Sequence, residues 1–317
     1  MPSLVQLEYV VAVANMKHFG QAAKACCVSQ PTLSLQIKKV EDQIGVEIFD
    51  RMKKPVIMTP EGEIFVRQAR LLLREHRILR SLFEQRGNDV SGEFRLGVIP
   101  TLTNSLLPSF IHEFSELYPE VILKIDELQT SSILKALEED RLDGALMATP
   151  LGVEGLHEEP LFYETFQVYA AKGHRLLKTK SCRLKDLDPS DLWLLQDGHC
   201  FKDQVVQLCP LDAKSEAGLP RVQFQGGNLD TLLRLIKRGH GYTLLPSFMT
   251  HHMEENEIQA HVRKFQKPYP AREISLVTRR TQWKRKIAEA IKETIQQHLP
   301  KTLSREKNED LNVLELC

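Results

Sequence analysis

The chain has 317 residues and a mass of 36.3 kDa, with 42% hydrophobic and 26% charged residues. These proportions are those of a globular protein, and the length exceeds that of one average domain, so two or more domains are expected. The 42 lysine and arginine residues equal the 42 aspartate and glutamate residues, which argues against a uniformly basic coat protein of nucleic acid.

The positive charge is concentrated at the start of the chain. Residues 1–86 carry 13 basic and 9 acidic side chains, a net charge of +4. No apolar run approaches the roughly 20 residues that cross a bilayer. Six cysteines are too few for a secreted disulfide scaffold and lack the paired spacing of a zinc site. We expect a cytoplasmic protein with no membrane contact, no metal and no cofactor, in which a disulfide would be a sensor or a catalyst.

A helix-turn-helix is expected at the front of the chain. Apolar residues recur at helical spacing over residues 4–14, and a short alanine-rich helix covers residues 20–26. Ser29 can cap a second helix over residues 30–43, with Pro31 in its first turn. In this motif the start of the second helix enters the major groove of DNA.

Polar side chains at the start of that helix can bond base edges or phosphates. The residues concerned are Ser29, Gln30, Pro31, Thr32, Ser34, Gln36 and Lys38. Downstream, residues 48–51 and 56–59 are predicted as two short strands, and we expect Arg51, Lys53 and Lys54 to meet the phosphate backbone as a wing. Residues 1–60 are thus predicted as a winged helix-turn-helix DNA-binding domain. A small helical domain with a solvated basic loop is the alternative.

Residues 61–91 are predicted as a dimerising linker helix followed by a hinge. Apolar positions step by alternate fours and threes, as in a coiled coil. They are Phe65, Ala69, Leu72, His76, Leu79 and Phe83. We therefore expect this helix to pair with a copy of itself rather than to pack into a core.

From residue 92 onward, strands alternate with helices, which predicts an α/β fold. The first group has strands at 94–99, 121–127 and 145–148 and helices at 106–117 and 131–140. The second has strands at 166–171, 193–195, 222–224 and 242–245 and a helix at 229–237, while a strand at 274–278 and a helix at 283–298 return to the first. This pattern predicts a regulatory domain over residues 92–300, with lobe I at 92–164 and 268–300, lobe II at 165–267, and a cleft between them. Residues 301–317 are expected to form a frayed polar tail.

Several motifs together resemble the LysR-type transcriptional regulators over residues 3–300. They are "VSQPTLS" at 28–34, the segment at 40–51, "TPEG" at 59–62 and "GYTLLP" at 241–246. The resemblance implies an all-α winged helix-turn-helix and a two-lobed α/β effector domain similar to type 2 periplasmic binding proteins. It also implies double-stranded promoter DNA and RNA polymerase as partners, and a homodimer or homotetramer.

The segment at 195–204, followed by Cys209, resembles the sensing loop of the hydrogen-peroxide-sensing OxyR subfamily. The resemblance implies that Cys200 is peroxidatic and that Cys209 resolves its sulfenic acid as a disulfide. A thiolate is the reacting form, and His199, Lys202 and a helix start near Asp203 would each favour it. Lys202 stands where the subfamily usually carries arginine, and Gln196 where it usually carries glutamate.

Two threonines match subfamily positions that offer hydroxyl groups toward peroxide. Thr101 ends the first strand of the regulatory domain in "GVIPT", and Thr130 ends "LQT". Both could instead be helix caps, since threonine is a common cap.

Formation of the disulfide should change the local fold. A helix over residues 203–208 would rise roughly 9 Å along its axis. Because bridged cysteines have Cα atoms within about 7 Å, this stretch would have to unwind or rebend. Such a change could reorient subunits and move the DNA-reading helices.

Two other functions compete with a peroxide-responsive regulator. The first is a LysR-type regulator that binds a small organic effector in the cleft, with Cys200 and Cys209 as inert core thiols. The second is a thiol peroxidase that turns over peroxide. The front domain argues against an enzyme, because catalysis needs no helix-turn-helix.

Overall fold

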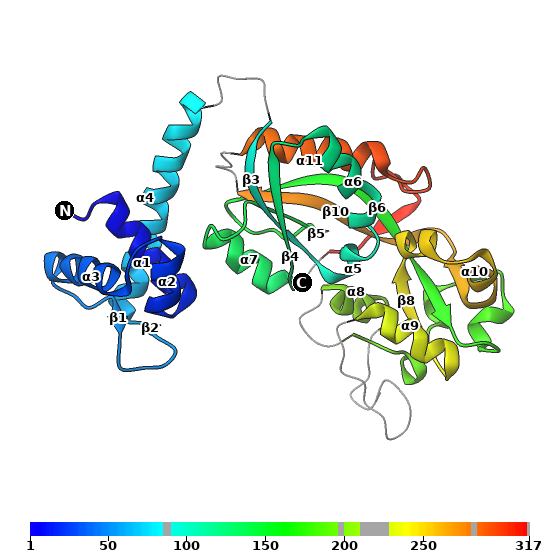
Figure 1. Cartoon of the computed structure of the whole chain (residues 1–317). Helices are drawn as coiled ribbons and strands as arrows, with labels where there is room; N and C mark the ends of the chain where they lie inside the picture. Colours follow the sequence, from blue (N-terminus) through cyan, green and yellow to red (C-terminus); the bar gives the residue numbers. More distant parts are fainter. Residues whose placement is uncertain (85–89, 196–199, 210–227, 280–283, 316–317) are drawn as a thin grey trace. The chain divides into compact units, whose positions relative to one another are not determined.

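The structure is a computed structural model that describes residues 1–84, 90–195, 200–209, 228–279 and 284–315 (Figure 1). The chain forms two compact units, Met1–Asn88 and Asp89–Cys317. Within the described ranges, no helix combines the length and the apolar character needed to cross a bilayer.

The first unit contains the predicted helix-turn-helix and its wing. Its elements are α1 Leu4–Met16, α2 Phe19–Ala25, α3 Gln30–Ile44, β1 Phe49–Asp50, β2 Ile57–Met58 and α4 Pro60–Glu84. Cys27 adopts a left-handed φ of 55° in the turn between α2 and α3. Ser29 caps α3 as predicted, because its hydroxyl accepts the Thr32 N–H at 3.2 Å. Apolar faces of α1, α2 and α3 meet in one core around Val10, Ala22 and Leu33.

The start of α4 is fixed against the wing. The Thr59 hydroxyl accepts the Gly62 N–H at 2.9 Å and so caps the helix. A Cβ atom at Gly62 would lie 2.1 Å from the Ile48 carbonyl oxygen, so only glycine permits this approach. The "TPEG" motif therefore joins the wing to the long helix.

The first half of α4 packs into its own domain. Val66, Ala69 and Leu73 are at most 5% exposed, and Ala69 and Leu73 pack against Leu7 of α1. The prediction that this helix pairs with a copy rather than packing into a core is therefore wrong for its first half, because the buried stripe faces α1. Leu72 and Leu79 of the predicted seam are each 57% exposed.

The second unit is built on one twisted sheet. Its strands are β3 Gly92–Val98, β4 Val121–Glu127, β5 Gly144–Thr149, β6 Leu156–Ala170, β7 Ser181–Cys182, β8 Tyr242–Pro246, β9 Val262–Phe265, β10 Tyr269–Arg279 and β11 Leu311–Val313. Its α-helices are α5 Pro100–Thr103, α6 Leu107–Leu117, α7 Thr130–Glu138, α8 Cys200–Leu208, α9 Leu229–Arg238, α10 Glu255–His261 and α11 Arg285–His298. Short 3₁₀ helices cover Arg175–Lys178, Leu184–Asp186, Pro189–Asp191 and Ser247–His252.

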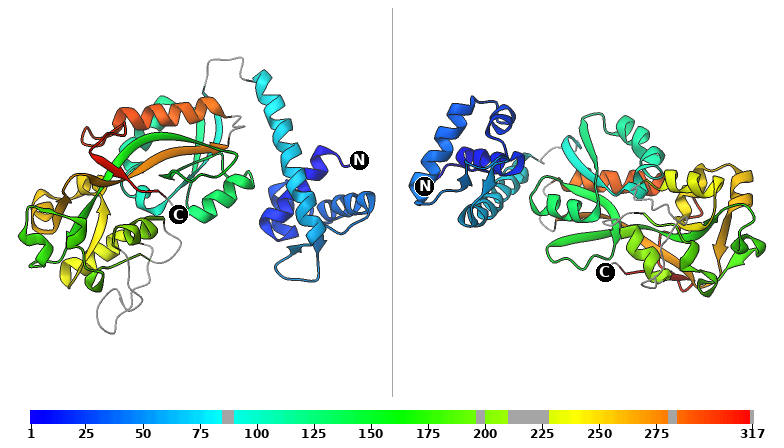
Figure 2. Two further views of the ribbon diagram at one scale, coloured as in Figure 1. Left: turned by 180° about the vertical axis from the view of Figure 1, so that it is seen from behind. Right: turned by 90° about the horizontal axis from the view of Figure 1, so that it is seen from below.

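The strand order is β4-β3-β5-β10-β6-β9-β7, with β8 paired to β6 and β11 paired to β10. Parallel β4, β3 and β5 belong to the first lobe, and α6 packs side by side with α11 (Figures 1 and 2). Because parallel crossovers are right-handed, α7 lies on the other face. The antiparallel strands β6 and β10 pair with each other and continue toward the second lobe, where β6 also pairs with β8 and β9.

Two details of the predicted second lobe differ. Residues 193–195 are not a strand, since Leu192 makes only an isolated bridge to Tyr242. The strand predicted at 166–171 is the end of the 15-residue β6. The strand predicted at 222–224 lies outside the described residues.

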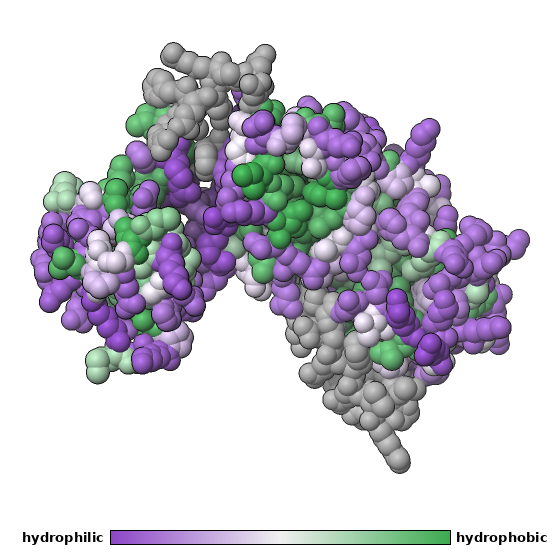
Figure 3. All heavy atoms as spheres, viewed as in Figure 1, coloured by the Kyte–Doolittle hydropathy of each residue, from purple (hydrophilic) through white to green (hydrophobic). Residues whose placement is uncertain are grey.

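Two separate hydrophobic clusters form the cores of the lobes. The first surrounds Phe94, Phe110 and Ile274, and the second surrounds Val168, Leu232 and Leu244. The surface visible in Figure 3 is largely hydrophilic, with an apolar area over β3 and β4. On the edge strand β4, Ile122 is 61% exposed.

The C-terminal segment is ordered, which corrects the predicted frayed tail. β11 pairs in parallel with β10, and the Tyr163 N–H donates to the Ser304 carbonyl at 2.7 Å. Leu303 enters the first core and Leu314 the second. The mostly polar composition of residues 301–317 led to the wrong prediction, because it gave no weight to these two leucines. Their burial offsets the entropic cost of ordering the chain.

We predict that Leu314→Ala lowers the free energy of unfolding of the regulatory unit by about 2 kcal/mol, because it removes a buried side chain from the second core. Urea denaturation followed by circular dichroism would measure the change. Asn312→Ala, at an exposed position of β11 just before Leu314, should change it by less than about 0.5 kcal/mol. Equal effects of the two substitutions would contradict a packed tail.

Candidate functional site

Cys200 is the first residue of α8 and lies at the edge of a narrow pocket. Its side chain is 7% exposed and belongs to the core of the first lobe. The pocket is lined by Ile99, Pro100, Thr101, Gln129, Thr130, Cys200 and Phe201. The structure thus brings both sequence-predicted threonines together with the predicted peroxidatic cysteine.

Neither threonine acts as a helix cap. Thr101 lies inside α5, whose N-cap is Ile99, and Thr130 begins α7, whose N-cap is Gln129. The Thr101 hydroxyl accepts a hydrogen bond from Arg272 Nη1 at 2.9 Å. The Thr130 hydroxyl oxygen is buried and makes no hydrogen bond of standard geometry to any residue in the described part of the chain.

Arg272 supplies a buried positive charge that the sequence interpretation missed. It is 0% exposed, and its Nε donates to Glu164 Oε1 at 2.9 Å. Its Nη2 lies 2.7 Å from the same oxygen but without the alignment of a hydrogen bond. The guanidinium carbon lies 5.6 Å from the ring centroid of Phe201, which follows Cys200. The sequence of β10 did not single it out, because the strand also contains Glu273, Ser275, Thr278 and a second arginine, Arg279.

Glu164 holds this arginine from β6. Its carboxylate is also buried, and its second oxygen accepts the Phe248 N–H at 3.2 Å. A buried carboxylate requires such compensation. The ion pair therefore fixes the guanidinium between β6, β10 and the pocket.

The surroundings of Cys200 raise the pKa of its thiol. Burial is the largest cause, while the Thr130 hydroxyl and the charge of Arg272 act against it. The Phe201 N–H, in the first turn of α8, also acts against the rise, as expected of a helix start, whereas the charge of the Asp203 carboxylate raises the pKa further. The cation that favours the thiolate is Arg272, where Lys202 was expected. His199 and Gln196 lie outside the described residues.

Gln204 is a second residue that sequence interpretation did not assign. It lies one turn after Cys200 on the same face of α8 and is 0% exposed. Considering only described residues, neither its amide nitrogen nor its amide oxygen has a hydrogen-bond partner. Buried polar atoms are normally paired, so this face of α8 has unused capacity to bind a small polar molecule.

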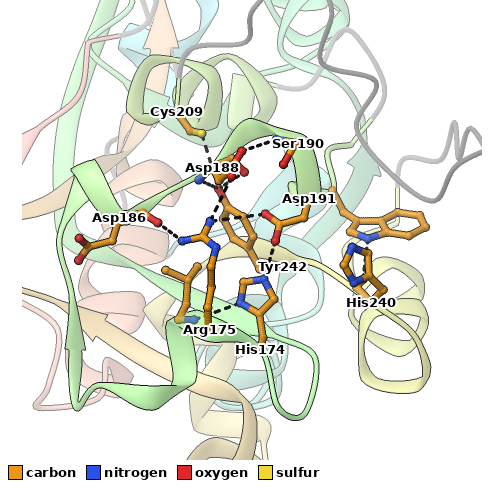
Figure 4. Close-up of polar contacts among 11 residues, drawn as sticks. His174, Arg175, Asp186, Asp188, Ser190, Asp191, Cys209, His240 and Tyr242 are labelled. Carbon is orange, nitrogen blue, oxygen red and sulfur yellow. Dashed lines mark hydrogen bonds and ion pairs between the residues drawn. The ribbon is translucent and has the colours of Figure 1, made fainter.

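Cys209 directly follows α8 and lies in the core of the second lobe (Figure 4). Its sulfur is 3.6 Å from the hydroxyl oxygen of Tyr242. Burial raises the pKa of the Cys209 thiol, and the Tyr242 hydroxyl acts against that rise. Nine helical steps of about 1.5 Å place the Cα atoms of the two cysteines about 13 Å apart along the helix axis. Both are free thiols, and the intact helix keeps them apart.

The predicted DNA-contacting residues all lie on the first unit, but Gln36 and Arg51 differ from their predicted roles. On α3 and its cap, the exposed residues are Ser29, Gln30, Pro31, Thr32 and Lys38. In the turn between β1 and β2, Lys53 and Lys54 are also exposed. Ser34 is half-buried. Gln36 is also half-buried and accepts a hydrogen bond from Gln6 at 3.0 Å, so it is not the exposed contact that was expected.

Arg51 is used to stabilise its own domain. Its guanidinium is 2.7 Å from Glu41 Oε2, donates to Ser34 Oγ at 3.1 Å and lies 5.2 Å from the centroid of the Phe19 ring. Glu41 in turn accepts the Ile48 N–H at 2.9 Å. These contacts brace α3 against the wing, a role that the simple phosphate-contact interpretation of Arg51 did not include.

A metal site is not evident in the described ranges, where no three histidine, cysteine, aspartate or glutamate side chains are grouped to hold an ion.

Comparisons with known proteins match both units. Residues 4–63 match the family model described as bacterial regulatory helix-turn-helix protein, lysR family, and residues 87–300 match the LysR substrate binding domain. A hydrogen peroxide-inducible genes activator of Pectobacterium carotovorum subsp. carotovorum is 35% identical over 92% of this chain and 95% of its own length. The DNA-binding transcriptional dual regulator OxyR of Escherichia coli is 34% identical over 94% of this chain and 98% of its own length.

A solved structure extends the similarity to three dimensions. A full-length OxyR variant from Pseudomonas aeruginosa aligns with a TM-score of 0.80 at 31% identity. The alignment covers 94% of this chain and 99% of that protein. The likeness therefore spans the helix-turn-helix and the two-lobed unit alike.

We predict that removing the buried charge of Arg272 shifts the titration of Cys200. The double variant Arg272→Gln with Glu164→Gln removes the cation without leaving a buried carboxylate unpaired. The pKa of Cys200 should rise further, because the thiolate loses the stabilising charge of Arg272. Its alkylation rate near neutral pH should fall about tenfold for each unit of that rise.

Peptide mass mapping of reduced protein alkylated at a series of pH values would measure the shift. Arg263→Gln is the matched control, because this arginine on β9 bonds the Leu177 and Thr179 carbonyls away from Cys200. A Cys200 titration that is the same in the double variant and the wild type would contradict the electrostatic role of Arg272.

Proposed function

This chain belongs to the LysR family of DNA-binding transcriptional regulators, and we propose that it senses hydrogen peroxide by reversible oxidation of Cys200 and controls oxidative-stress genes. One observation carries the proposal: Cys200 shares a narrow pocket with two threonines, beside a buried arginine. The full-length similarity to hydrogen peroxide-inducible activators supports it. Such a regulator would act in the cytoplasm, on promoter DNA.

The proposed chemistry begins with the thiolate of Cys200. Its sulfur attacks one oxygen of hydrogen peroxide and the O–O bond breaks, giving a sulfenic acid and hydroxide, which leaves as water with the thiol's proton. The Cys209 thiol then condenses with the sulfenic acid. The S–S bond forms and a second water leaves, so two thiols are oxidised by two electrons and one peroxide is reduced.

Pocket residues can assist the first step. The Thr101 and Thr130 hydroxyls of the pocket offer donors and acceptors for a molecule as small as peroxide, and the Gln204 amide lies one turn further along α8. The charge of Arg272 stabilises the thiolate and the departing hydroxide. Since burial raises the pKa of Cys200, the reactive fraction grows as pH rises toward that pKa.

The second step requires α8 to change shape. A disulfide needs the two Cα atoms within about 7 Å, and the helix keeps them about 13 Å apart. One of the two cysteines must therefore leave its core, and we propose that Cys209 does so, together with part of the helix. We propose that this rearrangement alters the relation of the two lobes and thereby the placement of the DNA-binding domains in the oligomer.

On the DNA side, the start of α3 is proposed to enter the major groove, and Lys53 and Lys54 to contact phosphates. A second copy of the chain is the proposed partner of Leu72 and Leu79 on α4, giving a homodimer or homotetramer. RNA polymerase is the proposed partner at the promoter.

We predict that Cys200→Ser abolishes the peroxide response of a reporter gene while leaving operator affinity within twofold. Cys209→Ser should form the Cys200 sulfenic acid without resolving it, because the second thiol is missing. A near-stoichiometric dose of peroxide, a dimedone trap and peptide mass mapping would measure both forms.

In the wild type, the same experiment should give a disulfide between Cys200 and Cys209 that thiol reductants reverse. Cys182→Ser is the control, because this buried thiol lies on β7 and should not affect the response. Unreactive Cys200 and Cys209 in the wild type would instead favour an organic effector for this regulator.

We predict that Gln30→Ala weakens binding to the specific operator about tenfold, because the exposed amide at the helix start loses its base contact. Gln43→Ala, at the far end of the same helix, is the matched control and should have little effect. Fluorescence anisotropy with labelled operator DNA would measure both. Lys53→Ala should reduce the salt slope of binding by about one. Wild-type affinity of Gln30→Ala would show that the groove-reading end of α3 is misassigned.

A further inference from the structure

Tyr242 is held rigidly at the start of β8, next to the segment that carries residues 188–193. The Trp193 N–H donates to the Tyr242 carbonyl at 2.7 Å. The preceding Gly241 has a φ of 84°, and a Cβ there would lie 2.4 Å from the Asp191 carbonyl oxygen. Tyr242 itself is 0% exposed. Its ring therefore cannot change place without disturbing this segment.

The Tyr242 phenol contacts both the neighbouring segment and Cys209. Its oxygen accepts the Asp188 N–H at 3.1 Å and can donate to the Asp188 carbonyl at 3.0 Å. The Cys209 sulfur lies 3.6 Å from the same oxygen, and either group can be the donor in that contact. The Cys209 thiol is therefore hydrogen-bonded to a fixed phenol inside the second core.

Ion pairs fix the segment to which the phenol is bonded (Figure 4). His174 Nε2 is 2.7 Å from Asp191 Oδ2, and Arg175 Nη2 lies 3.7 Å from Asp191 and 4.0 Å from Asp188. The His174 and Tyr242 rings are 5.6 Å apart. The phenol oxygen thus stays in place when Cys209 moves, and the thiol must break the contact to leave.

We propose that Tyr242 is a positioning residue that restrains the Cys209 thiol, and that its hydroxyl sets the rate at which the disulfide with Cys200 closes. This inference rests on the proposed function, because it concerns the second step of that chemistry. The restraint delays closure, so the sulfenic acid of Cys200 persists longer than it would beside an unrestrained thiol. The first step, at the pocket of Cys200, is independent of Tyr242.

The substitution Tyr242→Phe removes the oxygen and keeps the ring that fills the core. Disulfide closure should become about fivefold faster, the factor that corresponds to one net hydrogen bond of about 1 kcal/mol. The rate of sulfenic acid formation at Cys200 should stay within twofold of the wild type. A role that is only structural would lower the stability of the unit without separating these two rates.

Thr243→Val is the matched control. The Thr243 hydroxyl is buried on the same strand and donates to the Trp193 carbonyl at 2.8 Å, so its loss also frees a carbonyl in the neighbouring segment. Among the described residues, this hydroxyl contacts the Trp193 and Leu244 carbonyls and not Cys209. Rapid mixing of full-length reduced protein with peroxide, acid quench, alkylation and mass mapping would time the sulfenic acid and the disulfide in each variant.

A second measurement uses the Cys200→Ser background and times the alkylation of Cys209 by iodoacetamide. The rates are compared over a series of pH values at equal fractions of thiolate, because loss of the Tyr242 hydroxyl also raises the pKa of Cys209. On that basis Tyr242→Phe should increase the rate about fivefold, and Thr243→Val should leave it within twofold. Faster closure and faster alkylation in Tyr242→Phe alone would support the restraint.

Equal acceleration in both variants would overturn the inference, because it would show general loosening of the second lobe. Unchanged closure and alkylation in Tyr242→Phe would also overturn it. A wild-type protein that forms no disulfide would contradict the proposed function. In that case the alkylation rates of Cys209 would still test whether Tyr242 restrains the thiol.

Discussion

The structure depends on one helix that is anchored in two hydrophobic cores. Cys200 begins α8 in the core of the first lobe, while Phe201, Val205 and Cys209 lie in the core of the second. An intact helix of this length keeps the Cα atoms of the two cysteines about 13 Å apart, and apolar burial at both ends stabilises that separation. A chemical event that draws the thiols together therefore has to remove side chains from one of the cores. This constraint couples a reaction between two sulfur atoms to the arrangement of the lobes.

A buried ion pair sets the electrostatics at the Cys200 end. Glu164 and Arg272 come from β6 and β10, the two antiparallel strands that extend toward both lobes. Burying these charges is costly, and the hydrogen bonds to Thr101 and from the Phe248 N–H compensate part of that cost. The result is a cation beside a thiol whose pKa burial would otherwise raise further. The pocket thus combines low exposure with a preorganised charge, which water could not provide.

In the DNA-binding unit, some polar side chains stabilise the fold and others are exposed to solvent. Arg51, Glu41 and Ser34 form a contact that braces α3 against the wing, and Gln36 is bonded to α1 through Gln6. The exposed remainder, at the start of α3 and in the turn between β1 and β2, is what can face DNA. The sequence pattern alone could not separate these groups, because polar residues at one helical spacing look equivalent until their neighbours are known.

Local chemistry determined much of this protein directly from its sequence. The Ser29 cap, the helix-turn-helix, the alternating strands and helices and the family motifs all depend on residues close together in the chain. Tertiary structure alone decided which distant residues meet: Glu164 and Arg272 are 108 positions apart, and Cys209 and Tyr242 are 33 apart. It also decided the burial of Leu314, of Gln204 and of the two reactive thiols. Burial and long-range contacts control desolvation, and desolvation raises the pKa of Cys200, so no reading of its neighbours in the chain could have given that direction.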